Sequence, residues 1–190
     1  MSSLKKMYLE ELAPVMKEKK FKNINAVPKI EKVIVNVGIG KIRANQKLVD
    51  SVINNITLIT GQKPVIRKSK KAISGFKVRQ GDEVGLMVTL RSDKMYDFLQ
   101  KLANATLPRL RDFRGLDTKS FDGNANFSMG IREHIVFPEV SHQAENIHGL
   151  EIVIVTSTKN KEDAQALLEG LGFPFNSPLN KKESKEQNNG

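Results

Sequence analysis

Apolar residues at helical spacing mark two stretches in the first third of the chain. The N-terminal stretch contains Pro14, and because proline lacks a backbone N–H, this residue is expected to kink or tighten the helix. The second and clearer stretch follows Asn45, a favoured capping residue, and ends at Gly61, a favoured stop. The apolar positions of the two predicted helices are Leu4, Met7, Tyr8, Leu12, Val15 and Met16, and then Leu48, Val49, Val52, Ile53, Ile56 and Ile59.

Two more helices are predicted further along the chain. Ser92 can cap a helix that should stop before Pro108, since a residue that precedes proline disfavours helical backbone. A last helix with one apolar face lies near the C-terminus. The apolar positions of these two helices are Met95, Phe98, Leu99 and Leu102, and then Ala164, Leu167, Leu168 and Leu171.

Strand patterns alternate with these helices. Residues 29–37 and 65–67 are rich in valine and isoleucine, and residues 84–91 show apolar residues at every second position. A later strand carries Leu150, Ile152 and Ile154 on one face. The segment 109–138 is punctuated by glycine, and within it residues 135–137 form a short strand candidate.

This order of elements predicts an α+β fold. The strands at 65–67 and 84–91 are close enough in sequence to form a long hairpin, which favours antiparallel pairing over a parallel βαβ arrangement. A chain of 190 residues falls in the usual size range of one domain, and we expect residues 1–175 to form it. Residues 176–190 have one apolar residue, Leu179, so we expect a disordered tail there.

Side-chain alternation predicts a half-polar outer face on this sheet. When the valines and leucines of two strands point into the core, the residues between them must point away from it. This outer face can be an ordinary solvated surface, or it can be a platform on which neutral side chains bond RNA sugars and bases while cations meet phosphates. The residues expected on it are Lys32, Ile34, Asn36, Met87, Thr89 and Arg91.

Composition narrows the possible functions without selecting one. The net charge of +10 favours association with polyanions such as RNA, DNA or anionic lipid. The chain has no cysteine, which excludes disulfides, thiolate metal sites and cysteine nucleophiles. No run approaches the ~20 apolar residues that a membrane-spanning helix needs, and the first twenty residues lack the apolar stretch of a secretory signal. We therefore expect a cytoplasmic protein with no membrane association.

The strongest local charge lies between Gly61 and Gly81, over the first strand and the loop of the predicted hairpin. Between Gly61 and Gly81 there is no acidic residue, and Ser74, Gly75 and Phe76 interrupt the basic run to give a flexible loop. Phe76 can stack on an exposed base, or it can anchor the loop onto the core. The seven basic residues are Lys63, Arg67, Lys68, Lys70, Lys71, Lys77 and Arg79.

A second basic cluster consists of Arg109, Arg111 and Arg114 around Phe113. Guanidinium groups suit bidentate contacts with phosphate. Pairing with the neighbouring acidic residues, Asp112 and Asp117, is an equally good interpretation.

Enzymatic functions have little support in the sequence. The glycines at 38 and 40 follow a strand, but a dinucleotide-binding fingerprint needs a third glycine where the chain has Arg43. The spacing of three histidines and two glutamates matches no metal or acid/base motif, so we interpret the histidines as loop and surface residues. These five residues are His134, His142, His148, Glu133 and Glu139. We expect no catalytic residue, cofactor, metal or small-molecule substrate.

Several motifs in order along residues 4–175 resemble the bacterial ribosomal protein L5 family. They include VNVGIG at 35–40, TGQKP at 60–64, GFKVRQG at 75–81, VTLR at 88–91, LPRLRDFRGL at 107–116 and SFDG at 120–123. FPE at 137–139 and GFPF at 172–175 continue the match. The resemblance implies an antiparallel sheet of about five strands, with helices packed on one face and a long basic hairpin loop.

The resemblance also implies a function in the large ribosomal subunit. Family members attach 5S rRNA to the central protuberance beside the large-subunit rRNA. They also contact the transfer RNA in the peptidyl site through the loop, here about residues 68–82, and bridge to small-subunit protein S13. The positions that match the family's buried 5S contacts are Asn36, Gln62 and Thr89, and we add Lys32, Lys63 and Arg91 as flanking cations. The loop residues expected at the transfer RNA are Lys68, Lys70, Lys71, Ser74, Gly75, Phe76, Lys77 and Arg79.

The chain departs from the family pattern after Gly123. It has Asn-Ala-Asn-Phe at 124–127 where bacterial relatives commonly have Arg-Gly-Asn-Tyr, so one guanidinium and one phenol hydroxyl are missing. This puts any RNA contact at these positions in doubt. An RNA chaperone or RNA-modifying enzyme on the same fold is the alternative function, against which stands the lack of a cofactor motif.

Overall fold

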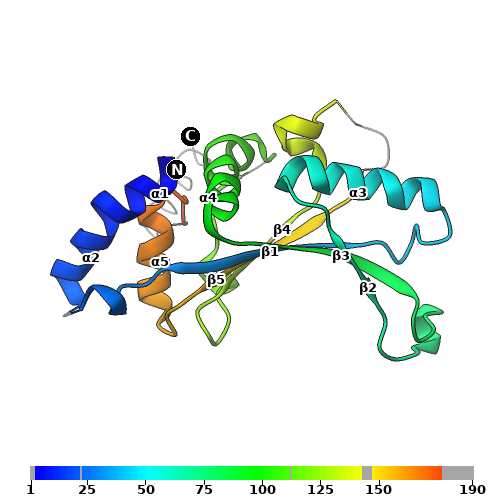
Figure 1. Cartoon of the computed structure of the whole chain (residues 1–190), viewed down its shortest axis with the longest axis horizontal. Helices are drawn as coiled ribbons and strands as arrows, with labels where there is room; N and C mark the ends of the chain where they lie inside the picture. Colours follow the sequence, from blue (N-terminus) through cyan, green and yellow to red (C-terminus); the bar gives the residue numbers. More distant parts are fainter. Residues whose placement is uncertain (1–2, 22, 112, 143–146, 177–190) are drawn as a thin grey trace, which may run out of the picture.

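The computed structural model of the chain describes residues 3–21, 23–111, 113–142 and 147–176 (Figure 1). The tail expected at 176–190 lies outside these ranges except for its first residue. Five strands form one sheet in the order β2-β3-β1-β5-β4, and every pair of neighbours is antiparallel. The predicted α+β class with antiparallel ladders is therefore confirmed. The strands are β1 (Ile30–Gly38), β2 (Val65–Lys68), β3 (Glu83–Leu90), β4 (Phe127–Ile131) and β5 (Leu150–Thr156).

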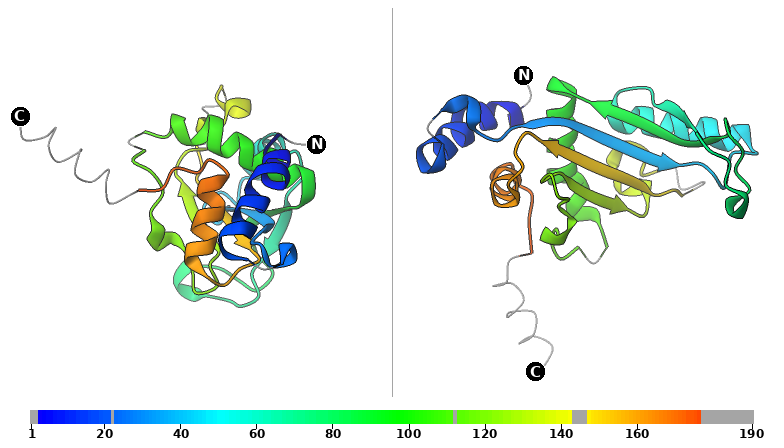
Figure 2. Two further views of the ribbon diagram at one scale, coloured as in Figure 1. Left: turned by 90° about the vertical axis from the view of Figure 1, so that its left-hand side faces the viewer. Right: turned by 90° about the horizontal axis from the view of Figure 1, so that it is seen from below.

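Among the described residues, helices cover one face of this sheet and none covers the other. Helix α3 (Gln46–Thr60) and helix α4 (Ser92–Lys101) lie above the sheet in Figure 1. The right-hand view of Figure 2 shows the sheet from its uncovered side, with these helices behind it. Helices α1 (Ser3–Met7), α2 (Ala13–Lys20) and α5 (Lys161–Gly170) gather at the end of the sheet where β1 begins. The arrangement agrees with the expected sheet with helices on one side.

Helix α3 shows how closely local sequence can define an element. The Asn45 side chain accepts a hydrogen bond from the Leu48 N–H, and Gly61 ends the helix in the left-handed conformation at φ 66°. Apolar side chains at a spacing of three and four face the sheet and are fully buried, which stabilises the helix against it. These side chains are Val49, Val52, Ile56 and Ile59.

The N-terminal helix is irregular just before Pro14, although it does not tighten as one of the two predicted outcomes had it. It widens instead into a π turn, η1 (Tyr8–Leu12), immediately before α2. A π turn is a usual way to relieve the clash and the missing donor that proline causes. Val15, predicted on the apolar face, is exposed. Tyr8 stays buried, donates to the Pro28 carbonyl oxygen at 2.9 Å, and burial raises its pKa to about 12.

Helix α4 corrects the prediction at its N-terminus. Arg91 occupies the N-cap position without a side-chain hydrogen bond, and Ser92 is the first helical residue at φ 51°, so Ser92 is not the cap. The α-helix itself ends at Lys101, before Pro108 as predicted. Two further helical turns follow it, a π turn, η4 (Leu102–Thr106), and a 3-10 turn, η5 (Leu107–Arg109), whose second residue is the proline. Proline is tolerated there because an N–H in the first turn of a helix needs no helical partner.

The segment 109–138 contains a strand that the sequence did not reveal. Residues 135–137 were predicted as a strand, but they belong to a 3-10 turn, η7 (His134–Val136), and the residue after it. The missing strand is β4, which pairs with β5 from Phe127 opposite Ile154 to Ile131 opposite Leu150. It is an edge strand, and a pattern of five residues with a glycine gives a weak signal.

Candidate nucleic-acid interface

The uncovered face of the sheet carries the polar residues that alternation predicted. Val33, Val35 and Val37 are buried, whereas Asn36 and Thr89 are only partly buried. Asn36 pairs with Met87 on one side and with Glu151 on the other, and Thr89 pairs with Ile34. Asn36 and Thr89 are therefore diagonal neighbours on one face, within reach of a single ligand.

Gln62 joins this group from the turn after α3. Its side-chain amide Nε2 donates to the Thr89 carbonyl oxygen at 3.4 Å. The turn itself is held by Thr60, whose hydroxyl donates to the Ile56 and Gln62 carbonyl oxygens. The structure thus brings Asn36, Thr89 and Gln62 together although they come from two strands and a turn. We call these three residues the neutral triad.

Cations flank the neutral triad. Val33 pairs with Leu90, so the next residues outward, Lys32 and Arg91, lie at the same end of the β1–β3 pair. Lys63 follows Gln62 and is exposed. One residue that sequence reasoning missed is Glu151, whose carboxylate lies 3.5 Å from the Asn36 amide nitrogen. The sequence could have placed Glu151 on the outer face, because it alternates with the inward-facing residues Leu150 and Ile152.

The basic residues between β2 and β3 lie in a segment with its own hydrogen bonds. The Ser69 N–H donates to the Asp82 carbonyl oxygen, and the Gly81 N–H donates to the Ser69 carbonyl oxygen. A 3-10 turn, η3 (Ser74–Phe76), lies at its far end, beside a bridge between Ile73 and Val78. The candidate side chains of this segment are exposed, namely Lys68, Lys70, Lys71, Ser74, Gly75, Phe76, Lys77 and Arg79.

Phe76 does not anchor this segment on the core. Its ring is 78% exposed, which excludes the anchoring interpretation. The segment is held instead by Arg43, from the connection between β1 and α3. The Arg43 guanidinium lies 3.0 Å from the Asp82 carboxylate and also donates to the Lys77 carbonyl oxygen. In the sequence, Arg43 is notable only because it occupies the position where a dinucleotide-binding fingerprint would have its third glycine. Nothing in its local context predicts its contacts with the β2–β3 segment.

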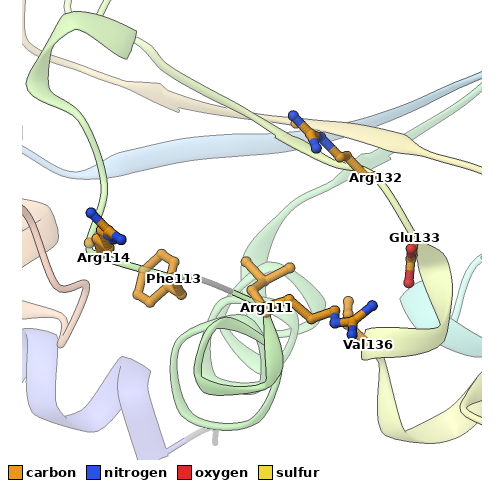
Figure 3. A pocket seen from close by; sticks show the side chains of 9 residues that line it. Arg111, Phe113, Arg114, Arg132, Glu133 and Val136 are labelled. Carbon is orange, nitrogen blue, oxygen red and sulfur yellow. The ribbon is translucent and has the colours of Figure 1, made fainter.

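Two of the three arginines in the second basic cluster line a pocket, and the third does not. Arg111 and Arg114 line an open pocket of about 780 Å³ beside β4, and Arg132 joins them from the end of that strand (Figure 3). Arg109 is exposed but does not line the pocket. In the described ranges no carboxylate lies within ion-pair distance of Arg109, Arg111 or Arg114. Asp112, one of the two predicted acidic partners, lies outside those ranges.

One of the three histidines lies in the core. His134 is fully buried and stacks on His148 with ring centroids 4.0 Å apart, and its Nε2 lies 3.2 Å from the Asn55 amide nitrogen. The interpretation of His134 as a surface residue is therefore wrong. Glu139 pairs with Lys101 at 2.5 Å. Within the described residues there is no group of three or more His, Cys, Asp or Glu that could hold a metal ion.

The departure at residues 124–127 forms a tight loop. The Asp122 carboxylate accepts from the Asn124 and Asn126 N–H groups at 2.8 Å and from the Asn126 side-chain amide at 2.9 Å. Ala125 has φ 59°, a conformation that favours glycine, and its methyl group is buried. Phe127 packs against Phe121 inside the core with ring centroids 5.0 Å apart, so its position is structural.

Comparison with known proteins identifies the family. A family model described as ribosomal protein L5 matches residues 23–79, and a second model, which describes the C-terminus of the ribosomal L5 family, matches residues 83–175. A large ribosomal subunit protein uL5 from Halothermothrix orenii is 53% identical over 178 residues, which is 93% of this chain and 99% of that protein. The protein of the same name from Ruminiclostridium cellulolyticum is 49% identical over 177 residues, or 92% of this chain and 98% of its own length.

These findings define a structural protein of the large ribosomal subunit rather than an enzyme. The chain belongs to the ribosomal protein L5 family. The location predicted from the sequence, a cytoplasmic ribosome, agrees with this membership. Over the described part of the chain, no helix has the length and apolar character needed to cross a membrane.

Proposed function

We propose that the chain binds 5S rRNA through the uncovered face of its sheet and attaches it to the central protuberance beside the large-subunit rRNA. The observation that supports this function is that Asn36 and Thr89 lie together on a face that no described helix covers, with Gln62 bonded to the Thr89 carbonyl oxygen. Neutral amides and hydroxyls can read sugars and base edges, whereas Lys32, Lys63 and Arg91 at the margin can meet phosphates. Long-range attraction by the net charge of +10 brings the RNA in, and the neutral triad fixes its register.

Two further contacts belong to the same proposal. The exposed basic residues of the β2–β3 segment contact the transfer RNA in the peptidyl site, with Phe76 free to stack on a base. A second surface contacts small-subunit protein S13 and bridges the subunits. The exposure of all eight loop residues supports the first contact, and family membership supports the second.

Substitution within the neutral triad tests the 5S assignment. Thr89→Val and Asn36→Ala should each weaken 5S rRNA binding about tenfold, because each leaves an RNA polar group without a partner. The dependence of log affinity on log salt should stay unchanged, since no phosphate contact is lost. Filter binding of the purified chain to 5S rRNA over a range of salt concentrations measures both quantities.

A matched variant controls for general damage. Asn54→Ala removes the same side chain from an exposed position on α3, which lies on the covered side of the sheet. If Asn36→Ala and Thr89→Val lose no more 5S affinity than Asn54→Ala, the assignment to the sheet face is wrong. Equal binding of 5S rRNA and unrelated RNA by all three variants would favour a general RNA chaperone instead.

A further inference from the structure

The pocket beside β4 unites arginines that lie far apart in sequence. Arg111 and Arg114 follow η5, and Arg132 follows the last residue of β4. In Figure 3, Arg111 and Arg114 lie on the segment after η5 with Phe113 between them, and Arg132 lies across from them at the end of β4. We call Arg111, Arg114, Arg132 and Phe113 together the arginine pocket. It lies at the β4 edge of the sheet, whereas the basic β2–β3 segment lies at the β2 edge.

The arginine pocket carries more positive than negative charge among the residues that the structure describes. All three arginines are exposed, and among the described residues none of them has a carboxylate within ion-pair distance. Glu133 lines the pocket too, so the lining carries three positive charges and one negative. Three guanidinium groups without carboxylate partners in one concave site attract an anion with several charged oxygens.

The backbone holds both sides of the pocket in place. Beyond Arg114, the Leu116 N–H donates to the Pro174 carbonyl oxygen at 2.8 Å, and the Asn176 N–H donates to the Leu116 carbonyl oxygen at 2.9 Å. Gly115 has φ 96°, and a Cβ there would lie 2.7 Å from the Asn176 side chain, so only glycine fits.

The backbone at Arg132 lies close to the backbone at Gly149. A Cβ on Gly149 would lie 3.1 Å from the Ile131 carbonyl oxygen and 3.3 Å from the Arg132 carbonyl oxygen. The absence of a side chain at 149 thus lets the two backbones meet. Because both backbone segments are anchored independently of any ligand, the wall of the pocket needs little rearrangement on binding, and only the exposed arginine side chains have to be ordered.

We propose that the arginine pocket binds an unpaired nucleotide of RNA, with its phosphates on the three arginines and its base against Phe113. Phe113 is half-buried and lines the pocket, so one side of its ring is available for stacking. A concave site of about 780 Å³ suits a single splayed-out nucleotide, whereas an RNA duplex presents a broad surface that contacts proteins across its shallow groove. Gly130 of the pocket pairs with Glu151, which in turn pairs with Asn36, so the pocket lies two strands away from the neutral triad.

The test compares two double variants with equal changes in net charge. Arg111→Gln with Arg114→Gln removes two pocket charges, and Lys17→Gln with Lys159→Gln removes two exposed charges elsewhere. Binding of the full chain to a labelled oligouridylate of about eight nucleotides is measured by fluorescence anisotropy at several salt concentrations. Thermal unfolding of each variant verifies that it is folded.

The pocket variant should bind oligouridylate at least about tenfold more weakly than wild type, and its salt slope should fall by about 1.4. The lysine variant should change both quantities much less. Phe113→Leu should weaken binding without altering the slope, because a stacking contact releases no counterions. Equal losses in the two double variants would overturn the proposal, since net charge alone would then explain binding.

A second pair of variants leaves the arginines intact. Gly130 lines the pocket, and a Cβ at this position would meet no atom within 4 Å, so a side chain can be added without a clash. Gly130→Glu and Gly130→Gln have the same shape and differ only in charge. Gly130→Glu should weaken oligouridylate binding clearly more than Gly130→Gln, and equal binding by the two variants would contradict a phosphate site.

Two further measurements distinguish the arginine pocket from the sheet face and RNA from an acidic protein ligand. Thr89→Val should leave oligouridylate binding unchanged while it weakens 5S binding, so failure of the sheet-face proposal and failure of the pocket proposal can be told apart. Oligoglutamate is the competitor for an acidic protein ligand. If oligoglutamate displaces oligouridylate more effectively than unlabelled oligouridylate does, the pocket is a site for acidic protein and the RNA proposal is overturned.

Discussion

Lys77 and Ala125 share an unusual backbone conformation but differ in what their side chains contribute. Both have positive φ, 52° and 59°, which costs an L-residue roughly 1–2 kcal/mol relative to glycine. The Lys77 side chain is exposed, whereas the Ala125 methyl group is buried. The balance between strain and burial therefore differs at the two positions.

Glycine substitution at these positions should have unequal effects. Lys77→Gly relieves the backbone strain of the folded state, and the only opposing effect is the greater conformational entropy that glycine gives the unfolded chain. The substitution should therefore stabilise the protein by about 0.5–1 kcal/mol. Ala125→Gly also loses a buried methyl group, worth about 0.8 kcal/mol, so its net effect should be near zero. Urea unfolding of both variants measures the difference, and a gain from Ala125→Gly as large as that from Lys77→Gly would contradict the argument.

Asp122 makes the stability of the 121–127 loop dependent on pH. Hydrogen bonds from the Asn126 side chain and backbone, followed by that from Asn124, lower the pKa of its carboxyl below the ordinary 3.8. A lowered folded-state pKa means that the carboxylate stabilises the fold above pH 3.8 and that this contribution is lost as the pH falls through the folded value.

Asp122→Asn should accordingly lower the free energy of unfolding at pH 7 and reduce its further loss below pH 4. Urea unfolding at both pH values measures this, with Asp97→Asn, an exposed carboxylate on α4, as the control. An equal acid-induced loss in wild type and Asp122→Asn would exclude Asp122 as a source of the pH dependence.

At the scale of elements, periodicity predicted what long amphipathic patterns can specify. It located α3, α5, β1, β3 and β5, because each buries a regular set of side chains. It failed where the signal was short. β4 has only five residues, and one of them is Gly130. Residues 135–137 are apolar like a strand, but they belong to a 3-10 turn and the residue after it, and so short an apolar run does not distinguish the two. Ser92 shows that a favoured cap residue need not cap when the preceding strand runs directly into the helix.

The contacts of Arg43 with Asp82 and Lys77 predict that a substitution of Arg43 increases local opening of the β2–β3 segment. Arg43→Gln removes an ion pair with Asp82 whose two side chains are about 30% exposed, so the segment should open roughly fivefold more often. Hydrogen exchange at the Ser69 and Gly81 N–H groups, both bonded inside the segment, should accelerate by that factor. Exchange in α3 is the internal control. Faster exchange there as well would mean that Arg43 supports the whole fold rather than the segment.

At the scale of the whole molecule, the candidate RNA surfaces are spread across the sheet in strand order. The basic segment joins β2 and β3, the neutral triad lies around β1 and β3, and the arginine pocket adjoins β4. Alternation predicted the outer face, and charge counting predicted the basic segment. Neither could place Arg132 beside Arg111 and Arg114, because that proximity depends on which strand occupies the sheet edge. Long-range proximity of this kind is set by topology and not by local pattern.

The contact between Arg43 and the β2–β3 segment has a mechanical consequence. Arg43 lies between Ile39 and Asn45 in a connection closed by hydrogen bonds from the Ile42 N–H to the Ile39 carbonyl oxygen and from the Asn45 N–H to the Ile42 carbonyl oxygen. Asn45 in turn caps α3. A force that pulls on the tip of the segment is therefore transmitted to the start of α3 as well as along β2 and β3. The segment is thus attached to the rest of the molecule in two ways, through strands β2 and β3 and through Arg43. We therefore expect its tip to be stiffer than that of a simple hairpin of the same length.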